Sequence, residues 1–244
     1  MSKKRQYESN GAINYRPRSN NPNSILGIDF SHNPEQKELI RLMNQDGLPV
    51  IFCTGDAGTG KTFTATAAAL DLVFQKKYNK IFYVREPLEV GRSMGFLPGD
   101  LGEKYGVYLD GLNDNLEHIC EINGGLNVNN LKTLIECIPP QFVRGRSFER
   151  AILLVDEAQN LSLDTIHTLM TRIGKFCKII FMGSMNQIDI RGKTAKNNDF
   201  MTAYNIVSHL EGIVGSVRLV QSERSEYCKI LDEAFANYKY SKRD

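Results

Sequence analysis

The feature that most restricts the fold of this chain is a glycine-rich octapeptide between two contrasting stretches. Residues Gly55–Thr62 read GDAGTGKT, between the apolar run Val50–Thr54 and the alanine- and leucine-rich stretch Phe63–Gln75. A loop of this pattern that follows a strand and opens a helix is typical of proteins that bind nucleotide phosphates. Its glycines let backbone N–H groups turn toward phosphate oxygens, and the helix N-terminus adds the positive end of its dipole. A turn that matches by chance is disfavoured, because the flanking strand and helix patterns are also in place.

The octapeptide predicts ATP and Mg²⁺ as ligands. We expect Lys61 to reach the β- and γ-phosphates and the Thr62 hydroxyl to ligate Mg²⁺. The residues expected to contact the nucleotide are Gly55, Asp56, Ala57, Gly58, Thr59, Gly60, Lys61 and Thr62.

A pair of acids ends another apolar run. Ile152–Val155 leads directly into Asp156 and Glu157, which predicts carboxylates at the carboxyl end of a buried strand, beside the phosphate-binding loop. We expect Asp156 to hold Mg²⁺ through its water shell and Glu157 to activate a water for attack on the γ-phosphate. A strand that simply ends in a charged turn is common, but its combination with the octapeptide favours the catalytic interpretation.

Two glutamines are candidates for contacts with the nucleotide. Gln187 follows a further apolar run, within Met182–Asp189, where it can sense the γ-phosphate and relay its loss to a partner. Gln36, upstream of the octapeptide, can read the adenine edge. An ordinary polar loop for Gln187 and a solvent-facing helix position for Gln36 are equally good interpretations.

Five short apolar runs predict buried strands, with helical stretches between them. The runs are Val50–Thr54, Lys80–Val84, Ala151–Val155, Lys178–Met182 and Val217–Val220. Helices are expected from Pro34, capped by Asn33, and over Phe63–Gln75 and Asp164–Ile173. Strands that alternate with helices indicate βαβ units and a mainly parallel sheet, and therefore a three-layer α/β/α fold.

Two segments depart from this alternation. Residues 1–24 are rich in Asn, Ser, Arg and Pro and carry a net charge of +4, against −2 for the remainder. We expect a disordered basic tail, which either binds a nucleic acid or, as we favour, keeps the chain soluble. Residues 85–150 are Gly-rich with few strand signals, so they predict an insertion of loops and helices within one domain that spans residues 25–244.

Composition argues against several classes of protein. No apolar stretch reaches the ~18 residues that a membrane-spanning helix needs, and the polar N-terminus lacks the apolar core of a secretory signal. The five cysteines form no CxxC pair, which favours reduced thiols, a cytoplasmic location and no zinc site.

Several motifs, taken together and in order, resemble those of the PhoH-like ATPases. They are GDAGTGKT at 55–62, GRSMGFLPGD at 91–100, FVRGRSFERAILLVDEAQN at 142–160, LMTRIG at 169–174 and GSMNQID at 183–189. The resemblance covers about residues 32–236. It implies a RecA-like P-loop NTPase domain, similar to the N-terminal core of superfamily-one helicases. It also implies a protein of bacteria or bacteriophages, linked to phosphate starvation and placed in the bacterial or host cytoplasm.

The resemblance implies Mg²⁺-dependent ATP hydrolysis, coupled to binding or remodelling of single-stranded RNA or DNA. Because a monomeric helicase needs two RecA-like domains, it also implies a homo-oligomer such as a hexameric ring. Two alternatives remain. One is a regulatory ATPase switch that binds a protein partner and no nucleic acid. The other is a phosphotransferase, which Glu157 disfavours because a water-activating carboxylate would waste ATP.

The chain departs from the family pattern at two places. It has Arg85-Glu86 where the family usually has Arg-Pro, and Gly183-Ser184 where the family usually has Gly-Asp. Both positions lie where helicase-like relatives couple nucleotide to nucleic acid.

Three arginines are candidates for phosphate contacts. The late arginine of the family matches Arg224, which we expect to act as an arginine finger on a neighbouring subunit. A surface arginine paired with Glu223 or Glu226 is the alternative. Arg144 and Arg146 either grip a phosphate of ATP or RNA or belong to a solvated loop.

Overall fold

The computed structural model describes residues 24–87, 106, 109–184, 198–228, 230, 231 and 234. Residues 1–23 of the expected tail, the GRSMGFLPGD motif and Gln187 therefore lie outside the described residues. Within the described part of the chain, none of the helices has both the length and the apolar character required to cross a membrane.

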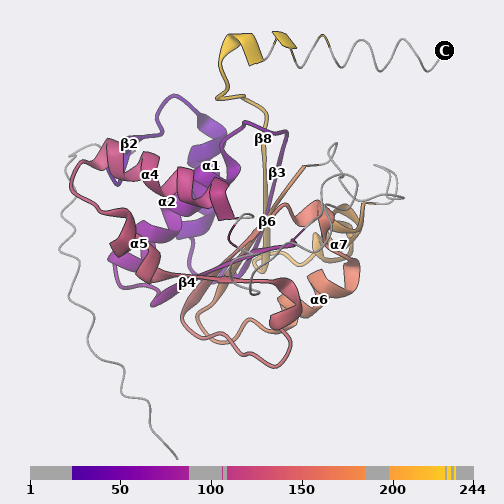
Figure 1. The fold of residues 1–244 in the computed structure, drawn as a ribbon. Helices are drawn as coiled ribbons and strands as arrows, with labels where there is room; N and C mark the ends of the chain where they lie inside the picture. The colour runs from indigo at the N-terminus through magenta and orange to yellow at the C-terminus, as the bar shows by residue number, and fades with distance from the viewer. Residues whose placement is uncertain are drawn as a thin grey trace, which may run out of the picture.

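A six-stranded sheet forms the centre of the molecule (Figure 1). Across the sheet, the order is β5 (Ile135–Ile138), β4 (Lys80–Arg85), β6 (Ala151–Asp156), β7 (Lys178–Gly183), β3 (Val50–Gly55) and β8 (Val214–Leu219). All neighbouring strands run parallel. The five predicted strands are present, with bounds that differ by at most three residues. The short edge strand β5 was not predicted, and it lies within the segment that was expected to hold only loops and helices.

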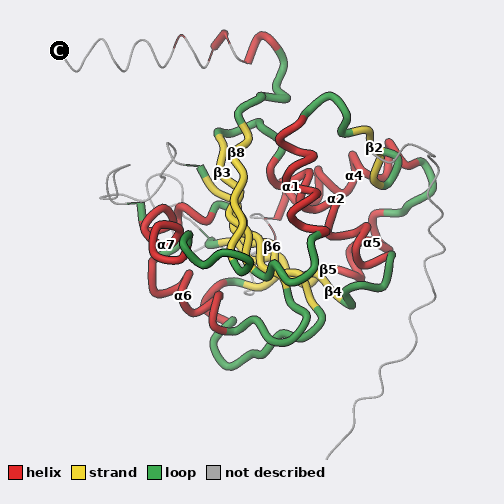
Figure 2. Tube along the Cα trace, turned by 180° about the vertical axis from the view of Figure 1, so that it is seen from behind, coloured by secondary structure: helices red, strands yellow, loops and turns green. Residues whose placement is uncertain are grey.

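Helices cover both faces of the sheet (Figures 1 and 2). One face carries α1 (Pro34–Asn44), α2 (Lys61–Phe74), α4 (Asp110–Asn123) and α5 (Val128–Leu134), and the other carries α6 (Leu163–Thr171) and α7 (Asp199–Val207). Short elements complete the fold: the hairpin β1 (Ser24–Ile25) and β2 (Ile28–Asp29), and the 3₁₀ turns η2 (Pro140–Phe142) and η3 (Ala158–Asn160). This α/β/α arrangement confirms the predicted fold class.

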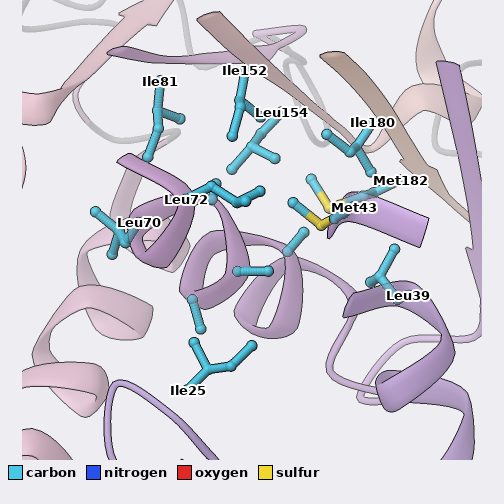
Figure 3. Packing of buried hydrophobic residues seen from close by; sticks show 14 of the residues in the cluster. Ile25, Leu39, Met43, Leu70, Leu72, Ile81, Ile152, Leu154, Ile180 and Met182 are labelled. Atoms are coloured by element: carbon cyan, nitrogen blue, oxygen red, sulfur yellow. The ribbon is translucent and has the colours of Figure 1, made fainter. Parts of the chain in front are cut away.

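Alternate residues of each central strand face opposite layers. In β6, Ile152 and Leu154 pack into the cluster beneath α1, α2 and α4 (Figure 3), while Leu153 and Val155 pack beneath α6 and α7. Because both faces are covered, the strand is apolar throughout, which is why the sequence shows a continuous run and no alternation.

The sequence explains where the two helices that lead to the site begin. Asn33 caps α1, since its side chain accepts hydrogen bonds from the backbone N–H groups of Glu35 and Gln36. The helix α2 begins at Lys61, two residues before the predicted start, directly after Gly60 in the left-handed conformation. Lys61 and Thr62 therefore belong to the first turn, where free N–H groups favour anions.

Candidate nucleotide-binding site

The loop between β3 and α2, hereafter the phosphate loop (Gly55–Thr62), depends on its glycines. Gly58 and Gly60 have φ angles of 80° and 79°, a region that residues with a Cβ avoid. A Cβ on Gly58 would lie 2.4 Å from side-chain atoms of Arg224, and one on Gly60 would lie 2.5 Å from Nε2 of Gln36. At both positions, glycine is therefore needed for two reasons: the backbone has a positive φ angle, and another side chain lies where a Cβ would be.

The amino group of Lys61 is held at the mouth of this loop. Its Nζ donates to the carbonyl oxygens of Gly55 at 2.7 Å and Asp56 at 2.9 Å. Burial lowers the pKa of Lys61, an effect that the nearby carboxylates of Glu157 and Asp156 oppose. Phosphate oxygens could take the place of the two carbonyls, and the contact of Lys61 with the β- and γ-phosphates stays a prediction.

Asp156 lies at the carboxyl end of β6 among hydrogen-bond donors. Thr62 Oγ1 donates to Asp156 Oδ1 at 2.9 Å, and the Tyr83 hydroxyl donates to Oδ2. The Arg85 guanidinium lies 3.8 Å from Oδ2. Asp156 itself is only 5% exposed. A hydroxyl and a carboxylate side by side form an oxygen donor set that fits Mg²⁺, which is usually bound by one or two carboxylates plus substrate phosphates.

Sequence reasoning missed Tyr83 and Arg85 as parts of this site. Both are on β4, which neighbours β6, and the register places Arg85 directly opposite Asp156. Burial and the charge of Asp156 raise the pKa of Tyr83 well above its usual value, so the phenol stays a donor. The sequence predicts β4 as a strand, but it does not show that β4 lies beside β6, and that neighbour relation is what brings Tyr83 and Arg85 to Asp156.

Glu157 is oriented by a buried glutamine. The glutamate has a left-handed backbone with φ of 51°, and its Oε2 accepts a hydrogen bond from Gln159 Nε2. Gln159 is fully buried, and its Oε1 accepts from the backbone N–H of Ser184 at 2.9 Å. Gln159, which the sequence did not single out, therefore joins Glu157 to the end of β7. The contact uses the backbone of Ser184, so it does not depend on the departure from Gly-Asp.

The electrostatics of Glu157 suit a base. Burial raises the pKa of Glu157, and the adjacent charge of Asp156 raises it further, against the opposing hydrogen bond from Gln159. A carboxylate with a raised pKa accepts a proton more readily near neutral pH.

Gln36 lies on the other side of the phosphate loop. It is 3% exposed, which excludes the solvent-facing interpretation. Its Nε2 donates to the backbone oxygen of Thr59 at 3.2 Å and lies 3.4 Å from Oε1 of Glu223. The side chain thus supports the loop directly, and a contact with adenine stays a prediction.

Residues Val220–Arg224, here called the closing segment, follow β8 and cross the same loop. Glu35 Oε2 accepts from the backbone N–H groups of Val220 and Gln221. The N–H of Glu223 donates to the carbonyl of Gly58 at 2.8 Å. The segment is therefore tied to both α1 and the phosphate loop.

The closing segment places Arg224 against Gly58 of its own chain. The sequence led us to expect an outward projection toward a neighbouring subunit. The backbone bonds of the closing segment explain the difference, because they hold the arginine over its own phosphate loop.

A pocket of about 620 Å³ opens beside the phosphate loop. Its wall combines apolar side chains with polar ones, among them Phe30, Gln36, Phe63, Asn115, His118 and Arg224. A hollow that combines apolar and aromatic side chains with many polar and charged ones, next to a phosphate site, can hold a nucleoside base, which has a flat apolar face and a polar edge.

Arg146 lies elsewhere. Its guanidinium pairs with Glu136 on the edge strand β5 at 2.6 Å, and β5 is separated from β3 by three strands. Arg144 is exposed in the same turn. Neither arginine belongs to the phosphate loop, so the solvated interpretation fits Arg146 better.

Comparison with known proteins decides the family. A family model described as PhoH-like protein matches residues 30–236. The chain belongs to the PhoH-like family. This PhoH-like chain is 35% identical to Protein PhoH2 of Bacillus subtilis (strain 168) over 202 residues, which is 79% of this chain and 44% of that protein. It is 31% identical to Protein PhoH of Escherichia coli (strain K12) over 186 residues, 74% of this chain and 51% of that protein.

The PhoH-like chain spans about half the length of the curated relatives it matches. A solved structure, the Pif1 helicase from Candida albicans, is similar with a TM-score of 0.38 and 16% identity, over 77% of this chain and 39% of the helicase chain. Family membership confirms the resemblance read from the motifs, and together with the parallel sheet it identifies a P-loop domain.

Proposed function

We propose that this PhoH-like chain hydrolyses ATP with Mg²⁺ at the phosphate loop. One observation carries the proposal: Thr62 Oγ1 and Asp156 Oδ1 lie 2.9 Å apart, although 94 positions separate the two residues. The fold thus brings an oxygen donor from the first turn of α2 to a carboxylate at the end of β6. Glu157, the expected base, is next to that carboxylate.

Each side chain of the site would have a distinct task. Loop N–H groups and Lys61 would hold the phosphates, and Thr62 and Asp156 would hold Mg²⁺, which when bound neutralises charge on the phosphates. Glu157 would accept the proton of the attacking water. Tyr83 would keep Asp156 in place.

Substitution of Lys61 tests the site. Lys61→Ala should lose turnover and bind ATP more weakly, because the amino group can no longer neutralise phosphate charge. The fold should survive, since the hydrogen bonds of this side chain within the described residues go to loop carbonyls. Lys37→Ala, at an exposed position of α1, is the matched control. Phosphate release and titration with a fluorescent nucleotide give the two readouts, and near-parental hydrolysis by Lys61→Ala would refute the proposal.

We further propose that hydrolysis is coupled to single-stranded RNA or DNA by a cytoplasmic homo-oligomer, for example a hexameric ring. The family resemblance supports this, and the link from Glu157 through Gln159 to the end of β7 could report the state of the nucleotide to a bound partner. The alternative is a regulatory switch that binds a protein partner, because the same link would serve either partner.

ATPase rates across a panel of RNA and DNA strands separate these two functions. Stimulation by a strand supports coupling to nucleic acid. A rate that no strand changes, in a chain that does hydrolyse ATP, favours the switch. Light scattering with and without nucleotide measures the oligomer.

A further inference from the structure

Three loops meet at the edge of the sheet opposite the phosphate loop. They precede β4, β6 and β7, which are neighbours in the sheet, so their amino ends lie side by side. Backbone hydrogen bonds join them: Asn79 N–H donates to the carbonyl of Arg150 at 2.7 Å, and Arg150 N–H donates to that of Lys175 at 3.2 Å. The three loops therefore form one continuous surface.

Each of these loops contains a non-glycine residue in the left-handed conformation. The φ angles are 61° at Lys76, 47° at Arg150 and 57° at Phe176. Glycine is the usual residue in such positions, including the one that ends a helix as Lys76 ends α2. The chain thus gives up stability at three neighbouring places, and strain of this kind tends to gather at functional sites.

Phe176 is the most informative of the three. Its side chain is 72% exposed, so neither packing nor backbone preference accounts for a phenylalanine there. The guanidinium of Arg150 lies 5.9 Å from the centre of its ring. The loop therefore presents an aromatic ring to solvent with a cation beside it.

The surroundings of Phe176 are basic. The exposed cations on the three loops are Lys76, Lys77, Arg150, Arg172 and Lys175. Among the described residues, none of these five cations forms an ion pair with a carboxylate within 4 Å. Glu149, Asp46 and Asp71 are the acids nearby, so the five exposed cations still leave an excess of positive charge. We call these five cations and Phe176 the basic edge surface.

We propose that the basic edge surface binds a single-stranded nucleic acid, with a base stacked on Phe176 and phosphates near the cations. Proteins that hold single strands combine a positive track with aromatic rings on which bases stack, and stacking tolerates any base. The cations would also attract an acidic protein segment, but a ring set among them matches a flat base that carries a phosphate on either side. The proposal deepens the proposed coupling to nucleic acid, on which its choice of partner rests.

The proposed strand site is separate from the nucleotide site. Arg150 precedes β6 and Asp156 ends it, and the strand has six residues. At ~3.3 Å per residue, the two ends lie about 20 Å apart. Substitutions on the basic edge surface should therefore leave ATP binding unchanged, and strand binding can be measured without ATP.

Fluorescence anisotropy with labelled oligo(U) and oligo(dT) tests the proposal on the full chain. Phe176→Gly should weaken strand binding about 10-fold, the scale of one lost base stack. Its melting temperature should stay the same or rise, since glycine accepts the left-handed backbone. Phe176→Tyr, which keeps a ring, should bind as the parent does. Arg150→Ala and Lys175→Ala should each lower the slope of log affinity against log salt by about 0.7.

Phe142 provides the matched control, because it is 51% exposed and lies on η2, which contacts Glu86 at the carboxyl end of β4 through Gln141. Phe142→Ala should bind strands normally. Unchanged affinity in Phe176→Gly, or a loss in Phe142→Ala instead, would overturn the proposal. So would an absence of strand binding by the parent, or binding of a labelled oligoglutamate in place of the strands. ATP hydrolysis by the same preparations is scored separately, so failure of the nucleotide site would be distinguishable.

Discussion

Asp156 and Glu157 are adjacent in sequence, yet their surroundings differ. Asp156 is surrounded by donors, namely the hydroxyls of Thr62 and Tyr83 and the guanidinium of Arg85. These donors fix the orientation of the carboxylate, which suits a metal ligand. Glu157 has burial and a neighbouring negative charge, which raise its pKa and suit a proton acceptor. Environments that differ in this way commonly divide the roles of paired carboxylates.

The division of roles predicts different defects in two isosteric variants. Glu157→Gln should keep near-normal ATP affinity and lose about 10²-fold or more in rate, because the amide accepts no proton. Asp156→Asn should also lose Mg²⁺-dependent binding. Nucleotide titrations with and without Mg²⁺, alongside phosphate release, measure both effects. Identical behaviour of the two variants would contradict the assignment.

The pH dependence of hydrolysis should report on Glu157 and its partner. Activity should fall as the pH drops through the pKa of Glu157, which is raised above its usual 4.5, because the protonated acid is no base. The hydrogen bond from Gln159 lowers this pKa, so Gln159→Leu should move the acidic limb to higher pH and reduce the rate. Gln141→Leu removes a similar bond, from the amide to Glu86, outside the site. A limb that stays in place in Gln159→Leu would show that Gln159 does not tune the base.

Among the helices and strands, the sequence predicted those that are marked by a local pattern, such as an apolar run or a capping residue. The continuous apolar runs identified β3 and β6, and Asn33 identified the start of α1. The edge strand β5 escaped because it follows α5 without a break and includes Glu136 and Cys137, so no turn residue or apolar run announces it. Pairing between strands is a property of the assembled sheet, which is why Tyr83 and Arg85 could not be assigned to the site from the sequence.

The strand β7 contains a buried lysine that anchors the end of α1. Lys178 is 2% exposed, and its Nζ donates to the backbone oxygens of Leu42, Gln45 and Leu48 at 2.6–3.3 Å. Lys178→Met would remove a hydrogen bond from each of these carbonyls, of which that of Leu42 keeps the bond from the N–H of Gln45, and should destabilise the fold by about 2–4 kcal/mol. Urea unfolding measures the loss. Lys175→Met, three positions earlier and exposed, is the control that should change little.

The same lysine makes stability depend on pH. Burial lowers the pKa of Lys178 from 10.5 to about 8, so between these values the unfolded chain binds the proton and the folded chain does not. The free energy of unfolding should therefore rise with pH across this window. Below about pH 8 the buried amino group is charged, and the full cost of burying that charge then lowers the stability. The difference in unfolding free energy between the parent and Lys178→Met isolates this residue. A difference that is constant from pH 7.5 to 10 would contradict the prediction.

For the whole molecule, the position of Arg224 bears on how subunits cooperate. The closing segment ties this residue to its own phosphate loop, so we expect it to act within one chain, and an arginine finger on a neighbour would require those bonds to break. Arg224→Ala should slow hydrolysis, and mixing it with Lys61→Ala should restore no activity. Recovery in the mixture, or activity that falls on dilution of the parent, would instead support the role between subunits.

The place of β3 in the sheet constrains how the chain matures during translation. Both neighbours of β3 come much later in the sequence, β7 at Lys178–Gly183 and β8 at Val214–Leu219. A ribosome that has released residues 1–176 has therefore delivered the phosphate loop and both acids, yet β3 has neither strand to pair with. The closing segment follows later still. We therefore expect a bound nucleotide to stabilise the nascent protein only after β7, β8 and the closing segment have emerged, so that the apolar runs stay exposed until then without help from a ligand.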